Sequence, residues 1–114
     1  MRAQFFFSEP RKFGQEPRGE VSAEIDMAVE FIRSTAGVII IERYPQYLQA
    51  NMTARAVELL SSGDVAGVEW AEIIAAWKWV KNVRAESKRA RAVVILAASV
   101  EDIDLAVAGI NWPA

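Results

Sequence analysis

The chain has 114 residues, of which 53% are apolar and 25% are charged, a balance typical of one globular domain rather than of a disordered or fibrous protein. Its 13 basic and 15 acidic residues provide no overall charge that would attract nucleic acid or an anionic membrane. Cysteine and histidine are both absent, which excludes disulfides, thiolate nucleophiles, zinc–thiolate sites and the usual general acid–base residue.

Residues 1–20 are predicted to form an N-terminal arm or loop ahead of a single helical domain over residues 21–114. Gly14 and Gly19 alternate with Pro10 and Pro17 among charged residues, a pattern typical of loops. The aromatic run Phe5–Phe7 has strand propensity but no evident hairpin partner. A short edge strand and an apolar arm packed on the helices therefore both remain open.

The first helix is predicted from Ser22, where apolar and acidic residues begin to alternate at helical spacing. Ser22 is its expected cap, and Glu24 and Asp26 suit the positive end of the helix dipole. The run of β-branched residues after Gly37 leaves a buried strand as the alternative for residues 39–41. The residues expected on the buried face recur three and four positions apart: Ile25, Ala28, Val29, Ile32, Ala36, Ile39 and Ile40.

Two further helices are bounded by clear start and stop signals. Pro45 suits the first turn of a helix that runs to about Ser61 and stops at Gly63. A short last helix is expected after Ser99, which can cap it, with acidic residues in its first turn. Apolar positions on these helices are Leu48, Met52, Ala56, Leu59 and Leu60 on the former, and Ile103, Val107 and Ile110 on the latter.

The longest predicted helix begins near Asp64 or Gly67 and continues at least to Arg91. Its buried stripe is narrow and made mostly of small residues, which permits close helix packing: Ile73, Ala76, Val80, Val83, Ser87, Ala90 and Val94. Trp70 and Trp77 flank this stripe on one side and Trp79 on the other. Together these patterns predict a mainly α fold, a bundle of three or four helices, with a short N-terminal strand or arm.

No motif in the sequence indicates catalysis, a cofactor or a metal site. Neither a GxGxxG nor a GxxxxGK[ST] phosphate-binding string occurs. Carboxylate pairs such as Asp26 with Glu30, Glu20 with Glu24 and Glu101 with Asp104 share helix faces. A solvated acidic face that complements the helix dipole explains them better than a catalytic or divalent-metal site does. The sequence therefore predicts a protein that is not an enzyme.

A ridge of basic residues is the most distinctive local feature. Lys81, Arg84, Lys88 and Arg91 follow helical i, i+3 and i+4 spacing close to Trp77. Such a ridge can follow a phosphate backbone, but pairing with the acidic first helix or with another subunit is the favoured interpretation. With Trp70, Trp77 and Trp79, these four cations form the predicted contact surface for a partner.

The segment Arg43–Leu59, RYPQYLQANMTARAVEL, resembles a segment of small helical proteins of tailed bacteriophages and prophages that are encoded near tail-fibre genes. The similarity continues through a tryptophan-bearing helix that ends in residues 83–87 and through a terminus at Asn111–Pro113, and so covers roughly residues 40–114. The resemblance implies a structural or chaperone-like role in tail or tail-fibre assembly. It implies no catalytic residue.

The leading expectation is therefore a non-enzymatic phage protein that binds a phage tail component, with self-association into a homo-oligomer compatible. One alternative is an inhibitor of a host defence complex, whose acidic first helix would mimic phosphate charge. Another is a small helical protein that binds nucleic acid through the basic ridge. No apolar run approaches the roughly 20 residues that a membrane-spanning helix needs. The expected location is thus the host cytoplasm, or the virion, with no membrane partner.

Overall fold

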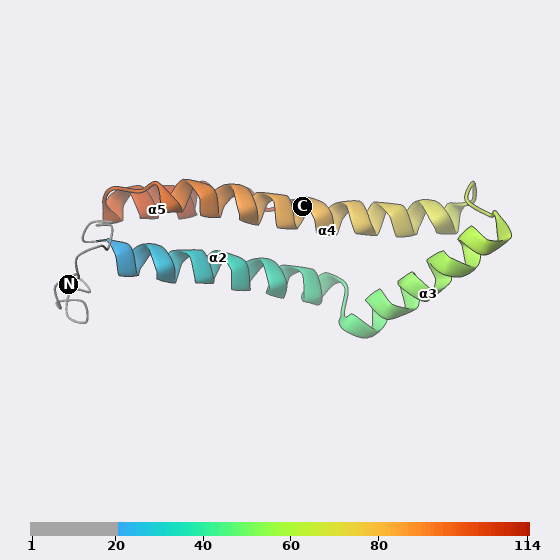
Figure 1. Ribbon diagram of the computed structural model, residues 1–114. Coiled ribbons are helices and arrows are strands. Elements are labelled where there is room, and N and C mark those ends of the chain that lie inside the picture. The colour runs from blue at the N-terminus through green and yellow to red at the C-terminus, as the bar shows by residue number, and fades with distance from the viewer. Residues whose placement is uncertain (1–20) are drawn as a thin grey trace, which may run out of the picture.

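The computed structural model describes residues 21–114, which form four helices and, within this range, no strand. The helices are α2 (Ser22–Arg43), α3 (Gln46–Ser62), α4 (Val68–Ile95) and α5 (Val100–Ala108) (Figure 1). The prediction of a mainly α bundle is confirmed. The predicted N-terminal arm or strand, including Phe5–Phe7, lies outside the described residues.

The two long helices α2 and α4 run side by side in opposite directions and form the body of the molecule (Figure 1). Helix α3 crosses diagonally from the end of α2 to the start of α4, and α5 folds back beside the end of α4. The molecule measures 62 × 26 × 21 Å. It is elongated because the 28 residues of α4 alone span about 42 Å at the usual helical rise of about 1.5 Å per residue.

The core consists of three small clusters arranged along α4. The first joins α2, α4 and α5 through Val21, Ile25, Ile32, Ala90, Val94 and Ile103. The second joins α2 and α4 through Ala36, Ile40 and Val83, and the third joins α3 and α4 through Ala56, Leu59 and Ile73. Trp112, which follows α5, packs against both the first and the second cluster. The predicted small-residue stripe of α4 is thus its buried face, with only Val80 half-buried.

Two of the predicted helix boundaries are confirmed by their capping geometry. The hydroxyl of Ser99 accepts a hydrogen bond from the backbone N–H of Asp102 at 3.1 Å, and α5 begins at the next residue. Gly63 ends α3 with a φ of 75°, a left-handed conformation that favours glycine.

At α2 the structure corrects one prediction, the cap at Ser22, and confirms another, the helix over residues 39–41. Ser22 does not cap the helix, because Val21 takes the capping position and its backbone oxygen accepts from the N–H of Ile25 at 2.8 Å. The isoleucines at residues 39–41 are helical, not a strand, since Ile40 is buried against α4 and this packing outweighs their β-propensity. Among residues 21–114, no helix is both long and apolar enough to cross a membrane.

Candidate functional site

The three tryptophans of the predicted contact surface do not lie together. Trp70 packs against the α3–α4 cluster, while Trp77 is 39% exposed on the same flank of α4. Trp79 faces the other flank, where its ring lies 4.4 Å from the Arg43 guanidinium and edge-on to Tyr44 at 5.6 Å. Of the three tryptophans, Trp77 is therefore the most accessible, and it is only partly exposed.

Trp79 instead helps to hold the segment after α5, residues 109–114, against the body of the molecule. Its indole Nε1 donates a hydrogen bond to the backbone oxygen of Ala114 at 2.9 Å, and Nη1 of Arg43 donates to the same oxygen at 2.9 Å. Together with α5, this segment fills one of the two grooves between α2 and α4. An aromatic residue that sequence reasoning assigned to a partner thus serves the fold.

Glu86 fastens the same segment to α4. Its Oε2 accepts a hydrogen bond from the backbone N–H of Asn111 at 2.8 Å, and both of its oxygens accept from the Arg89 guanidinium, at 2.8 and 2.6 Å. The Arg89 pairing and then the Asn111 hydrogen bond lower the pKa of Glu86 from 4.5 to about 2. The carboxylate form is therefore the one that holds the segment in place.

Replacing Glu86 with glutamine is expected to lower the free energy of unfolding by about 2 kcal/mol near neutral pH, the usual value for a charge-assisted network. Because the folded-state pKa lies below the ordinary value of 4.5, this stabilisation is complete above that pH and is lost as pH falls toward about 2. Urea unfolding at a series of pH values measures it. Glu72→Gln, at an exposed position of the same helix, is the control and should change stability little. A Glu86 variant as stable as wild type across this range would contradict the assignment.

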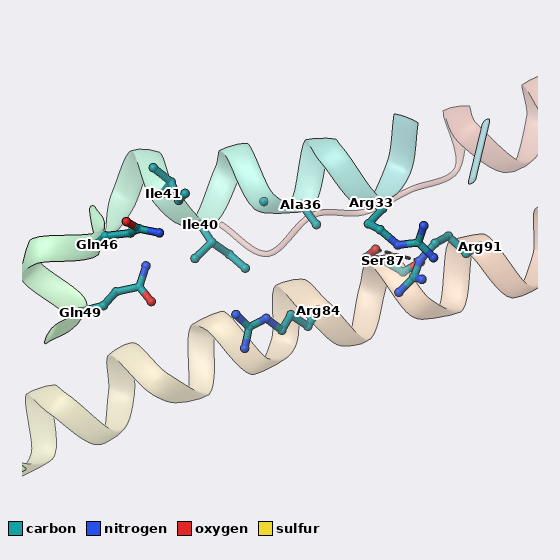
Figure 2. A pocket seen from close by; sticks show the side chains of 10 residues that line it. Arg33, Ala36, Ile40, Ile41, Gln46, Gln49, Arg84, Ser87 and Arg91 are labelled. Atoms are coloured by element: carbon teal, nitrogen blue, oxygen red, sulfur yellow. Dashed lines mark hydrogen bonds between the residues drawn. The ribbon is translucent and has the colours of Figure 1, made fainter. Parts of the chain in front are cut away.

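The second groove between α2 and α4 is open and lined by basic side chains (Figure 2). Arg33 from α2 and Arg91 from α4 point toward one another beside Ser87, and Arg84 extends from α4 nearer to the start of α3. Gln46 and Gln49 from α3 close that end. The groove has a volume of about 400 Å³, and no acidic residue lines it. We call it the arginine groove.

The basic ridge divides between this groove and the outer surface. Arg84 and Arg91 line the arginine groove, whereas Lys81 and Lys88 are exposed beside it. Within residues 21–114, none of the four ridge residues forms an ion pair; the cations that do are Arg33, Arg55 and Arg89. The predicted pairing of the ridge with the acidic first helix is therefore not found within residues 21–114.

The outer face of α2 carries apolar residues that sequence reasoning missed. Met27, Phe31, Val38 and Ile41 are 71%, 58%, 54% and 48% exposed, on the side of the helix opposite to the buried Ile32 and Ala36. With Ser34 they recur at alternating spacings of four and three residues, the spacing by which two helices pair along a seam. We call these four residues the outer α2 stripe. The spacing of these residues is visible in the sequence, but the apolar residues of the buried face were sufficient to predict an amphipathic helix.

A second hollow lies between α3 and α4, and ion pairs of Arg55 lie beside it. Arg55 binds Glu69 through Nε at 2.7 Å and Nη2 at 2.9 Å, and binds Glu58 through Nη1 at 2.7 Å. Hydrogen bonding to Arg55 lowers the pKa of Glu69. This network ties the start of α4 to α3 and neutralises Arg55, the one cation that lines this hollow in the described part of the chain.

The described part of the chain shows no cluster of metal-binding side chains. Residues 21–114 contain no group of three or more histidine, cysteine, aspartate or glutamate side chains placed to hold a metal ion. Comparison with protein-family models, curated protein sequences and solved structures finds no match to this chain. Surfaces open to a partner include the outer α2 stripe, the arginine groove and a hollow of about 500 Å³ between the end of α4 and α5, where Leu96 and Leu105 are 83% and 72% exposed.

Proposed function

We propose that this protein is a non-enzymatic phage or prophage protein that binds another protein in tail or tail-fibre assembly, and that the outer α2 stripe is its docking surface. The observation that carries the proposal is that α2 is apolar on two opposite faces, of which the described residues, 21–114, cover one. A helix that is apolar on both sides is normally buried on both sides. Exposed apolar patches of this kind mark protein interfaces.

The expected partner element is an amphipathic helix whose apolar seam is flanked by basic residues. Helices that pair along a seam of this spacing often place charged residues at its two edges, and the charged residues there are Glu30, which also pairs with Arg33, and Glu42. A second copy of this chain would offer acidic residues at the same positions and no lysine or arginine. A partner with basic edges complements them, which favours a different protein over self-association.

The absence of histidine and cysteine supports a binding role over a catalytic one, because most general acid–base and nucleophilic designs need one or the other. The assembly context rests on the resemblance of residues 40–114 to small phage helical proteins. The resemblance lies mainly in α3 and α4, whereas the docking surface lies on α2. Because the two parts of the proposal rest on different segments, one experiment tests both.

The experiment captures tagged protein from cells in which the encoding element is induced, at low and at high salt. We expect a tail or tail-fibre component to co-purify with wild type and to survive high salt, since apolar contacts are not screened. The double variant Phe31→Ser/Val38→Ser should lose it, with a dissociation constant for the purified pair raised by at least about 100-fold.

The matched control is Val57→Ser/Leu60→Ser, which removes two equally exposed apolar side chains from α3. This variant should retain the partner. Capture of a host defence complex, of nucleic acid that high salt removes, or of further copies of this chain alone would each overturn the assembly proposal. Retention of the tail component by the Phe31/Val38 variant would refute the outer α2 stripe as the docking surface.

A further inference from the structure

The arginine groove gathers three arginines, of which Arg84 and Arg91 have no ion pair within residues 21–114. Arg33 keeps one bond to Glu30 at 3.2 Å, and Arg91 donates through Nε to the hydroxyl and backbone oxygen of Ser87. The remaining guanidinium N–H groups of both, and all of those of Arg84, have no acceptor within residues 21–114. Figure 2 shows Arg33 and Arg91 turned toward one another across the groove.

Three guanidinium groups in one groove do not stabilise the fold. Like charges that share one groove repel each other, and a surface selected for stability intersperses charges of both signs. An anion placed between the guanidinium groups removes this repulsion and accepts paired hydrogen bonds from them. The groove therefore has the properties of an anion site more than those of a structural element.

We infer that the arginine groove binds an acidic segment of the partner protein, one that presents two or three carboxylates about one or two helical turns apart. Arg84 and Arg91 lie seven residues apart on α4, about 10 Å at the usual helical rise, which matches carboxylates two turns apart on a facing helix. The floor of the groove is apolar, formed by Ala36 and Ile40, and suits the methylene groups of glutamate side chains.

Protein carboxylates fit this groove better than a nucleic-acid backbone does. The groove is short, with a volume of about 400 Å³, and the chain has a net charge of −2. Ile41 lies at the edge of the groove and also in the outer α2 stripe, so one bound protein can contact both. The inference thus rests on the proposed function.

The test is an NMR titration of isotope-labelled protein with capped hexaglutamate as the probe. We expect the side-chain Nε–H signals of Arg33, Arg84 and Arg91 to shift together, and Arg84→Gln/Arg91→Gln to weaken binding at least 10-fold. The matched control Lys78→Gln/Lys81→Gln removes the same charge from exposed positions of α4 outside the groove and should weaken it less than twofold. The Phe31→Ser/Val38→Ser variant should bind hexaglutamate as wild type does.

Three results would overturn the inference. The first is that hexaglutamate does not shift the three arginine signals. The second is that the Lys78/Lys81 control variant weakens binding as much as the Arg84/Arg91 variant does. The third is that a single-stranded oligonucleotide of equal charge binds more tightly at the same arginines. Because the probe does not need the outer α2 stripe, failure here with retained stripe-dependent capture refutes the groove alone. Loss of capture with intact hexaglutamate binding refutes the proposed docking surface alone.

Discussion

Replacing Trp112 with alanine is expected to lower the free energy of unfolding by about 3 kcal/mol, at the lower end of the range for removing a core aromatic residue. Trp112 is half-buried, yet it packs against both clusters that join α2 to α4. It also anchors the segment whose last residue, Ala114, accepts hydrogen bonds from Trp79 and Arg43. Urea unfolding followed by far-ultraviolet circular dichroism measures the loss.

Trp77→Ala provides the control for Trp112→Ala. Trp77 is 39% exposed and belongs to none of the three core clusters. We expect its replacement to cost less than about 1 kcal/mol, as for surface positions away from the core. Equal losses from the two variants would mean that the segment after α5 contributes no more to stability than an exposed side chain does.

Most of the helical elements could be predicted from the sequence because their signals are local. Gly63 ends α3 and Ser99 caps α5, since each of these signals depends on a few neighbouring residues. The narrow stripe of α4 also identified its buried face. The segment Ile39–Ile41 was ambiguous because β-propensity competed with helical periodicity, and burial of Ile40 against α4 decides it.

The candidate surfaces could be predicted only in part, because exposure depends on how the helices are arranged. Arg84 and Arg91 were identified from spacing, but their neighbour Arg33 comes from another helix, 51 residues away from Arg84. Trp79 was assigned to a partner because the sequence does not reveal that residues 109–114 return along α4. Which groove that segment fills, and so which one stays open, is a tertiary property.

The outer α2 stripe illustrates a different limit. One apolar face was sufficient to predict an amphipathic helix, so Met27, Phe31, Val38 and Ile41 were not needed for that prediction. Both faces are visible in the sequence once two periodic sets are sought. Since α4 and α5 pack on one side of α2, only the structure identifies which set stays exposed.

Ile32 and Phe31 are adjacent in sequence but lie on the buried and the exposed face of α2, respectively. Replacing each in turn therefore distinguishes an effect on stability from an effect on partner binding. Ile32 is 0% exposed within the cluster that joins α2, α4 and α5, and Ile32→Ala is expected to lower the free energy of unfolding by about 3 to 4 kcal/mol. Phe31 is 58% exposed, and Phe31→Ala should cost less than about 1 kcal/mol.

Partner binding should show the opposite order. Phe31→Ala should weaken the purified complex by at least about 10-fold, the usual effect of removing an aromatic residue from the centre of an interface. Ile32→Ala, measured at a temperature where it remains folded, should bind within about threefold of wild type, a difference of under about 1 kcal/mol. If Phe31→Ala destabilised the protein as much as Ile32→Ala does, both faces of α2 would belong to the folded core, and its outer face would not be available to a partner.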